Sequence, residues 1–140
     1  WKTRKETIVF TNGCFDILHF GHIKYLADAA SMGTKLIIGL NTDGSIQKIK
    51  GPQRPVNNQL TRSSILASLF FVDAVILFEE PTPLKLIETI RPDILVKGSD
   101  YTIDNIVGAN FIMSYDVKVK LIKFIEVFST TSIINKIKNI

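Results

Sequence analysis

Short apolar runs rich in β-branched residues alternate with helix-like segments along the whole chain. Runs of this length predict buried β-strands, and apolar residues spaced three and four apart predict amphipathic helices. The expected strands cover residues 7–11, 35–40, 74–78, 93–97 and 117–124. The expected helices cover residues 21–32, 58–71, 81–90, 102–114 and 130–140. Strands joined by helical crossovers form parallel sheets with helices on both faces. The pattern therefore predicts a doubly wound, Rossmann-like α/β fold with a five-stranded parallel sheet.

In such a sheet, ligands bind at the carboxyl ends of the strands, near the point where the strand order reverses. The loops that follow strands are therefore the place to look for chemistry. The stretch between Asn41 and Gln59 shows no sustained periodicity and is rich in Gly, Pro and Asn. Loops of that length in compact domains are usually functional.

The composition limits the class of protein. A chain of 140 residues with 46% hydrophobic residues fits a single domain with a real core, residues 1–140. Its one cysteine, Cys14, excludes an internal disulfide framework and a Cys-rich zinc site, and a reducing, cytoplasmic setting is expected. No apolar run is long enough to predict a membrane span. The net charge of +4 comes from basic residues near both ends without interleaved aromatics, so we expect no nucleic-acid partner.

The most informative stretch is Thr11-Asn-Gly-Cys-Phe-Asp-Ile-Leu-His-Phe-Gly-His22, which runs from the first strand into the first helix. It contains both histidines of the chain, His19 and His22. A helix N-terminus attracts phosphate, and imidazoles beside it can stabilise the charge that grows on phosphate oxygens during group transfer. Gly13 and Gly21 are expected to let the backbone approach a ligand closely. The stretch predicts a phosphate-binding site.

Other readings of these residues stay open. A His-x-x-His pair can bind a metal, but no further Cys or His completes a zinc shell, so no metal site is predicted. The pair can also simply cap the helix. Cys14 is interpreted as a small buried thiol rather than a nucleophile. Asp43 can accept a sugar hydroxyl or cap the loop, and Arg62 can bind phosphate or be a surface cation. Hydroxyls in Ser129-Thr-Thr-Ser132 can cap the last helix, bind phosphate, or do both.

The residues Asn12-Gly-Cys-Phe-Asp16 followed by His19-Phe-Gly-His22 resemble the signature of the nucleotidyltransferase superfamily with the His-x-Gly-His motif. Further motifs resemble the heptose 1-phosphate adenylyltransferases of that superfamily, and the similarity spans residues 6–138. They are Asn41-Thr-Asp43, Lys50-Gly51, Arg54-Pro-Val-Asn57, Val96-Lys-Gly-Ser-Asp-Tyr101 and Ser129-Thr-Thr131. The combination is more selective than His-x-Gly-His alone.

The resemblance implies an enzyme that transfers AMP from ATP to D-glycero-β-D-manno-heptose 1-phosphate. ADP-heptose for surface lipopolysaccharide and pyrophosphate would be its products, with Mg²⁺ as the partner of the triphosphate. The implied catalytic residues are His19, His22 and Lys50. The implied nucleotide- and phosphate-binding residues are Asn12, Gly13, Cys14, Phe15, Asp16, Gly21, Arg62, Gly98, Asp100, Tyr101, Ser129, Thr130 and Thr131. Asp43 and Arg54 are implied to bind the sugar phosphate.

Two other functions remain open at this point. One is a cytidylyltransferase that uses CTP and a polyol phosphate such as glycerol 3-phosphate. The other is a nucleotide-binding module without turnover. The resemblance also implies pairing of two chains, and it is compatible with a sugar kinase domain ahead of residue 1.

Overall fold

The computed structural model describes residues 1–98, 106–107, 109–123, 125 and 128–140. Five strands form one parallel sheet in the order β3-β2-β1-β4-β5. Their bounds are β1 Ile8–Gly13, β2 Lys35–Asn41, β3 Ala74–Phe78, β4 Ile94–Gly98 and β5 Lys118–Ile122. All five match expected strands to within two residues at each end. The doubly wound α/β prediction is confirmed, and the strand order reverses between β1 and β4.

Side chains alternate between the two faces of the sheet, as the pleat of a strand requires. Val9, Ile38 and Val96 belong to one buried cluster, whereas Phe10, Ile37 and Leu95 belong to the other. The three inner strands β1, β2 and β4 are mostly buried on both faces, which is typical of strands with long apolar runs.

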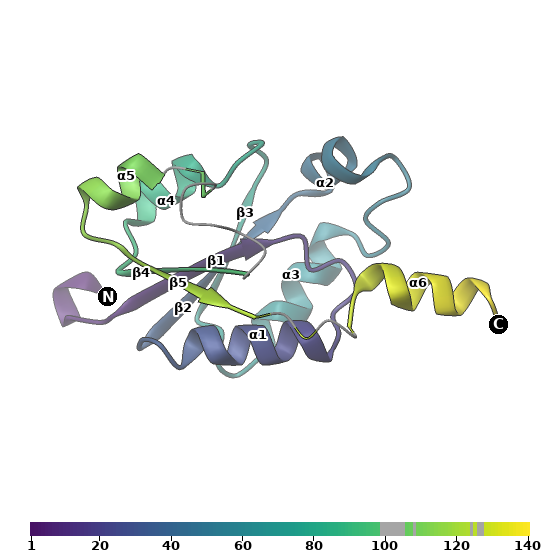
Figure 1. Ribbon diagram of the computed structural model, residues 1–140, viewed down its shortest axis with the longest axis horizontal. Coiled ribbons are helices and arrows are strands. Elements are labelled where there is room, and N and C mark those ends of the chain that lie inside the picture. The colour runs from purple at the N-terminus through teal and green to yellow at the C-terminus, as the bar shows by residue number, and fades with distance from the viewer. Residues whose placement is uncertain (99–105, 108, 124, 126–127) are drawn as a thin grey trace.

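The helices cover both faces of this sheet (Figure 1). Leu26 and Ala29 of α1 and Leu66 of α3 pack against one face, and Ile87 of α4 and Ile112 of α5 pack against the other. The bounds of these four helices are α1 Phe20–Ala30, α3 Gln59–Ala67, α4 Leu84–Ile90 and α5 Ala109–Ser114. Of the expected helix 102–114, residues 102–105 and 108 lie outside the described residues.

The stretch between β2 and α3 differs from the expected loop, because it contains the helix α2, Asp43–Lys50. Thr42 caps this helix by accepting the backbone N–H of Ser45, and Ile46 is fully buried beneath it. Gly51 ends the helix with a φ of 95°, a backbone conformation that residues other than glycine rarely adopt. Two isoleucines among polar residues give a weak apolar stripe, which explains why periodicity did not reveal the helix.

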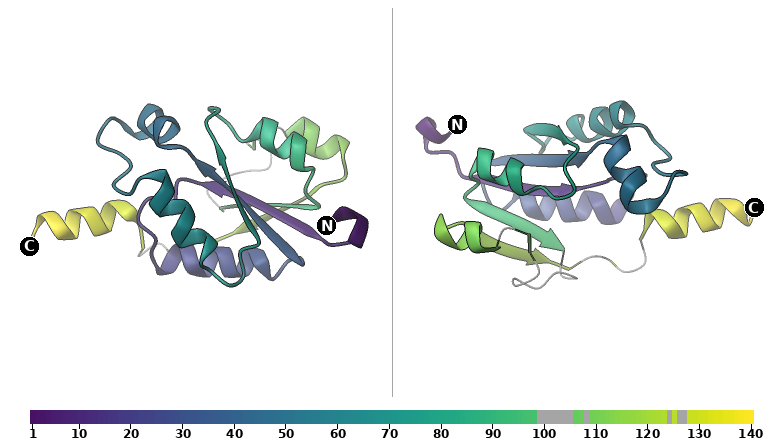
Figure 2. Two further views of the ribbon diagram at one scale, coloured as in Figure 1. Left: turned by 180° about the vertical axis from the view of Figure 1, so that it is seen from behind. Right: turned by 90° about the horizontal axis from the view of Figure 1, so that it is seen from above.

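The two ends of the chain lie at opposite ends of the molecule in all three views (Figures 1 and 2). A short 3₁₀ turn, η1 Lys2–Arg4, opens the chain. The last helix, α6 Thr130–Lys138, extends away from the sheet, and none of its residues is fully buried. Among the described residues, no helix has the length and hydropathy needed to cross a membrane.

Candidate active site

A cavity of about 440 Å³ lies at the carboxyl ends of the strands, where the strand order reverses. Strand β1 contributes Asn12 and Gly13, and β4 contributes Lys97 and Gly98. The cavity thus lies where a doubly wound sheet is expected to bind its ligand.

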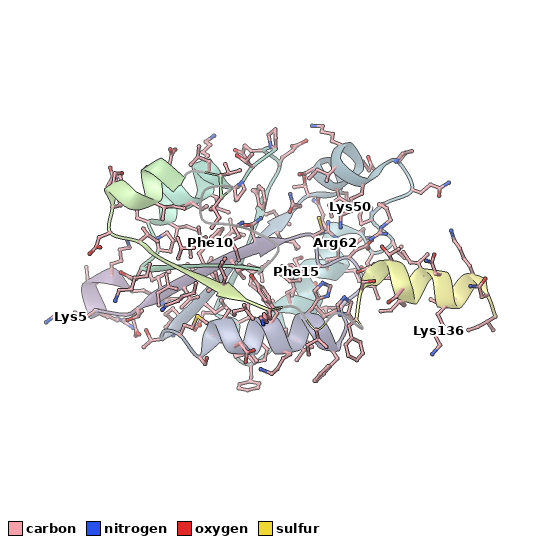
Figure 3. The ribbon with its side chains drawn as sticks, viewed as in Figure 1. Lys5, Phe10, Phe15, Lys50, Arg62 and Lys136 are labelled. Carbon is pink, nitrogen blue, oxygen red and sulfur yellow. The ribbon has the colours of Figure 1, made fainter. Side chains whose placement is uncertain are left out.

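Three groups that are distant in the sequence meet at this cavity. His22 comes from α1, Lys50 from the end of α2, and Thr130 from the start of α6. The Thr130 hydroxyl donates to the backbone oxygen of Ile17, 3.5 Å away, so the start of α6 adjoins the loop before α1. Figure 3 shows Lys50, Arg62 and Phe15 at this end of the sheet, with Lys5 at the far end. An imidazole, an ammonium and a hydroxyl therefore face one space, as a polyphosphate site requires.

The two imidazoles of the His-x-Gly-His stretch stack on each other. Their ring centroids are 3.7 Å apart with an interplanar angle of 20°. The backbone N–H of His22 donates to His19 Nδ1 at 3.4 Å, so His19 caps the N-terminus of α1. His22 lines the cavity, whereas His19 is not one of its lining residues. The capping interpretation therefore applies to His19, and phosphate binding by the two histidines stays a prediction.

Gly21 is buried next to this stack. A Cβ atom there would approach His19 Nδ1 and Phe128 Cβ to 3.1 Å each, tighter than most contacts. Gly21 does not line the cavity, so its lack of a side chain makes room for the imidazole rather than for a ligand. A role of Gly21 in the approach of a ligand stays a prediction.

Burial sets the protonation state of His22. Removal from water, together with the neighbouring His19, lowers the pKa of His22 from 6.5 to about 4. Desolvation also lowers the pKa of His19. His22 Nδ1 is buried and has no hydrogen-bond partner within the described part of the chain. The ring facing the cavity is thus neutral at pH 7, and it keeps a polar atom that a ligand can satisfy.

Asp16 lines the cavity but is already occupied by protein groups. Its carboxylate accepts from Arg54 Nε at 2.6 Å and from the backbone N–H groups of Val56 and Asn57 at 2.8 and 3.0 Å. The Asn57 side chain in turn donates to the Asp16 backbone oxygen. Asp16 and Arg54 therefore fasten the loop between α2 and α3 to the end of β1, and Arg54 does not line the cavity.

Arg62 does not lie at the cavity, where a cation that binds a triphosphate would be expected. It is 1% exposed and does not line the cavity. It donates to the backbone oxygens of Asn57, Cys14 and Asn41 at 2.8–2.9 Å and to Asp43 Oδ1 at 2.7 Å. Arg62 is therefore not a surface cation: it joins the residue after β1, the end of β2, the start of α2 and the loop before α3. Asp43 serves as its partner and does not reach the cavity either.

The remaining candidates fall into three groups. Cys14, Phe15 and Gly98 line the cavity as expected. Burial raises the pKa of the Cys14 thiol, which agrees with an unreactive thiol. Ser129 caps α6 by accepting the Ser132 backbone N–H at 3.0 Å, and neither Ser129 nor Thr131 lines the cavity. Asp100 and Tyr101 lie outside the described residues.

Sequence reasoning missed several residues of the cavity wall. They are Tyr25, Asn41, Ile49, Phe78, Pro81, Thr82, Pro83, Lys97 and Val107. Lys97 and Asn41 carried a signal that could have found them, because each is a polar residue at the carboxyl end of an otherwise apolar strand. The stretch 81–83 was interpreted only as a helix start.

The described residues do not form a metal cage. No group of three or more His, Cys, Asp and Glu side chains among them is placed to hold an ion. Asp16, the carboxylate among the described residues of the cavity wall, is engaged by Arg54 and the loop.

Comparison with known proteins gives consistent matches. A family model described as "Cytidylyltransferase-like" matches residues 10–136. The "Bifunctional protein HldE" of Campylobacter fetus is 58% identical over 95% of this chain, and that of Syntrophotalea carbinolica is 52% identical over 97%. This chain spans 28% of the length of each of these relatives.

Solved structures agree with the sequence matches. The lipopolysaccharide core biosynthesis protein from Thermoplasma volcanium has a TM-score of 0.70 at 29% identity, over 85% of this chain and 96% of that one. The pantoate-beta-alanine ligase from Francisella tularensis has a TM-score of 0.62 at 18% identity, over 98% of this chain and 72% of that one. The second match supports the fold alone.

Proposed function

This chain belongs to the cytidylyltransferase-like family of nucleotidyltransferases, and from that premise we propose that it transfers the adenylyl group of ATP to a sugar 1-phosphate. The proposed acceptor is D-glycero-β-D-manno-heptose 1-phosphate, and the products are ADP-heptose and pyrophosphate. The observation that carries the proposal is the meeting of His22, Lys50 and Thr130 at one cavity. Identity of 50–58% to bifunctional HldE proteins over nearly the whole chain supports the sugar phosphate over a polyol phosphate.

The reaction needs no nucleophile from the protein. A phosphate oxygen of the acceptor forms a bond to the α-phosphorus of ATP, and the bond from that phosphorus to the bridging oxygen breaks on the opposite side. Pyrophosphate leaves with the electron pair. The acceptor is already anionic at neutral pH, so the protein acts by positioning and by stabilising charge.

Three cavity residues have a part in this scheme. The neutral His22 imidazole donates a hydrogen bond to oxygens near the α- and β-phosphates. Lys50 stabilises the charge that develops in transfer, and Thr130 binds the departing pyrophosphate. His19 holds the His22 ring by stacking and by capping α1. Mg²⁺ would accompany the triphosphate; because the described residues offer it no cage, no step is assigned to it.

Release of pyrophosphate tests the proposal. The protein is incubated with Mg²⁺, with ATP or CTP at equal concentration, and with heptose 1-phosphate, other sugar 1-phosphates or glycerol 3-phosphate. We expect release that depends on ATP and on a sugar 1-phosphate. Preference for CTP with glycerol 3-phosphate would establish the alternative enzyme, and binding without any release would establish a nucleotide-binding module. The expected pairing of two chains stays a prediction, which sedimentation can check separately.

A further inference from the structure

A second cavity, of about 450 Å³, lies at the amino ends of the strands, at the end of the molecule that carries the N-terminus in Figure 1. It is lined by the turn that leads into β4, residues 91–94, and by the turn that leads into β5, residues 115–118. Lys2 of η1 also lines it. Strand β4 runs from one cavity to the other, because Ile94 lines the second and Gly98 lines the first. Four steps along a strand cover about 13 Å, so the two cavities are separate.

Backbone hydrogen bonds fix the two turns that form this cavity. The backbone N–H of Lys118 donates to the oxygen of Asp93 at 3.0 Å, and Lys118 stands beside Ile94 in the ladder of β4 and β5. The backbone N–H of Asp93 donates to the oxygen of Ile8 at 2.9 Å, and the Asp93 carboxylate accepts the Ile8 N–H at 2.7 Å. The cavity wall is therefore held by the sheet itself and has a defined shape.

Arg91 stands at a position of this wall that favours glycine. It ends α4 with a φ of 49°, a left-handed backbone conformation that is unfavourable for residues with a side chain. Its guanidinium lies over the ring of Tyr115, 4.6 Å from the ring centroid, which fixes the plane of the guanidinium. Within the described part of the chain, the guanidinium makes no hydrogen bond or ion pair. A cation is thus kept in a fixed orientation at a cavity, without a protein acceptor for its N–H groups there.

Three cations and two carboxylates line the described part of this cavity. The cations are Arg91, Lys2 and Lys118, and the carboxylates are Asp93 and Asp116. The Lys2 ammonium donates to the backbone oxygen of Arg91, so η1 is held against the same turn. Asp93 is engaged by the backbone of β1, whereas Asp116 is exposed in the turn before β5. Because the cations outnumber the carboxylates, the cavity favours an anion.

We propose that this second cavity binds a small anion that carries a phosphate group, with Arg91 as its principal ligand. A guanidinium presents parallel N–H donors that match two oxygens of one phosphate, and the ammonium of Lys118 adds positive charge. A phosphate with two negative charges gains more from three cations than a carboxylate with one charge does. Inorganic phosphate, pyrophosphate and sugar phosphates share this chemistry, and a titration with each distinguishes them. The site lies outside the active-site cavity and does not depend on the proposed transfer reaction.

An NMR titration of the isotope-labelled protein with inorganic phosphate at constant ionic strength tests the site. The backbone amide signals of Asp93 and Lys118 should shift and saturate with a Kd on the order of 1 mM. The amide signals of Gly13 and His22 report binding in the active-site cavity separately. Arg91→Gly removes the cation without straining the backbone. It should weaken the binding seen at Asp93 and Lys118 at least tenfold, as expected for a lost charge-assisted hydrogen bond, and leave the titration of Gly13 and His22 unchanged.

Asp116→Gly is the matched control, because Asp116 also lines the cavity and also has a left-handed φ, of 56°. This variant removes a negative charge instead of a positive one, so phosphate should bind at least twofold more tightly. Both variants should melt within about 5 °C of the wild type. In Arg91→Gly, relief of the left-handed backbone offsets the lost stacking on Tyr115. If Arg91→Gly does not fold, Lys118→Met on the edge strand β5 replaces it and should weaken phosphate binding at least threefold.

Each outcome of the titration supports or overturns the site. Saturable shifts at Asp93 and Lys118 that Arg91→Gly weakens and Asp116→Gly strengthens support it. No saturation below about 30 mM phosphate, or equal affinity in the wild type and Arg91→Gly, overturns it. Weaker binding in Asp116→Gly, or acetate that binds as tightly as phosphate, overturns the assignment to a phosphate-bearing anion. Tighter binding of pyrophosphate or of glucose 1-phosphate than of phosphate supports the site and identifies the larger ligand. Pyrophosphate release by the wild type is a separate measurement, so failure of this site leaves the proposed function standing.

Discussion

At the scale of single residues, His22 is the group whose chemistry the structure defines best. It is neutral, held by a stacked partner, and keeps a buried nitrogen available to a ligand. Loss of one preorganised donor to a transferring phosphoryl group costs on the order of 10²- to 10³-fold in kcat. We expect His22→Ala to show this loss while ATP still binds. Single-turnover kinetics and a nucleotide-binding titration measure the two effects, and full turnover by a folded His22→Ala protein would contradict the role.

The low pKa of His22 also has a consequence for stability. The unfolded chain takes up a proton near pH 6.5, whereas the folded chain resists protonation until about pH 4. Protons therefore favour the unfolded state in that interval, and this group's contribution to folding stability falls as the pH drops from about 6.5 toward 4. Urea unfolding at several pH values should show a shallower decline in His22→Gln than in the wild type. Parallel declines would mean that His22 titrates normally.

Gly21 offers a test of how tightly the imidazole stack is packed. A Cβ at residue 21 crowds His19 Nδ1 at 3.1 Å, whereas a Cβ at Gly44 of α2 meets only Glu79 Oε1, at 3.4 Å. We expect Gly21→Ala to lower kcat by at least tenfold, because a small displacement of a catalytic group is costly. Gly44→Ala should leave kcat unchanged and stabilise the helix by about 0.5–1 kcal/mol. Equal kinetics in the two variants would show that the stack tolerates displacement.

At the scale of elements, Arg62 connects the ends of β1 and β2 to the start of α2 and to the loop that follows α2. Arg62→Met leaves Asp43 and three buried or partly buried carbonyl oxygens without this donor, which predicts a loss of about 3 kcal/mol in the free energy of unfolding. Arg62→Lys should recover little, because one ammonium cannot reach four acceptors. Arg4→Met, which removes an exposed arginine from η1, is the control and should change stability by less than about 0.5 kcal/mol.

The elements themselves were largely predictable from the sequence. Residues 36–40 and 74–78 are uninterrupted apolar runs, which is typical of strands in a parallel sheet. Helix α2 was missed because it has no sustained apolar periodicity. Its features are the cap at Thr42 and the burial of Ile46, which a periodicity pattern does not reveal. The role of Arg62 was also beyond reach, because its three carbonyl partners are scattered over 43 positions and only the folded chain brings them together.

At the scale of the whole molecule, α6 contributes a site residue without contributing to the core. None of its residues is fully buried, yet Thr130 at its start lines the cavity. A chain that stops at Ser129 should therefore melt within about 5 °C of the full chain, since little apolar area is lost. Its affinity for nucleotide should fall at least tenfold, because Thr130 and the N-terminus of α6 are gone. Calorimetry gives both values, and unchanged affinity would remove α6 from the site.

The strand order has a consequence for synthesis on the ribosome. Strands β1, β2 and β3 neighbour one another and come from the first 78 residues, so they can pair as soon as they emerge. The cavity is different, because β1 must also accept β4, whose partners Ile94 and Leu95 are more than eighty positions further along the chain. A nascent polypeptide that has been synthesised only as far as β3 can hold a three-stranded intermediate but not the cavity that β4 helps to form. Ligands therefore stabilise only the finished domain and cannot assist its early assembly.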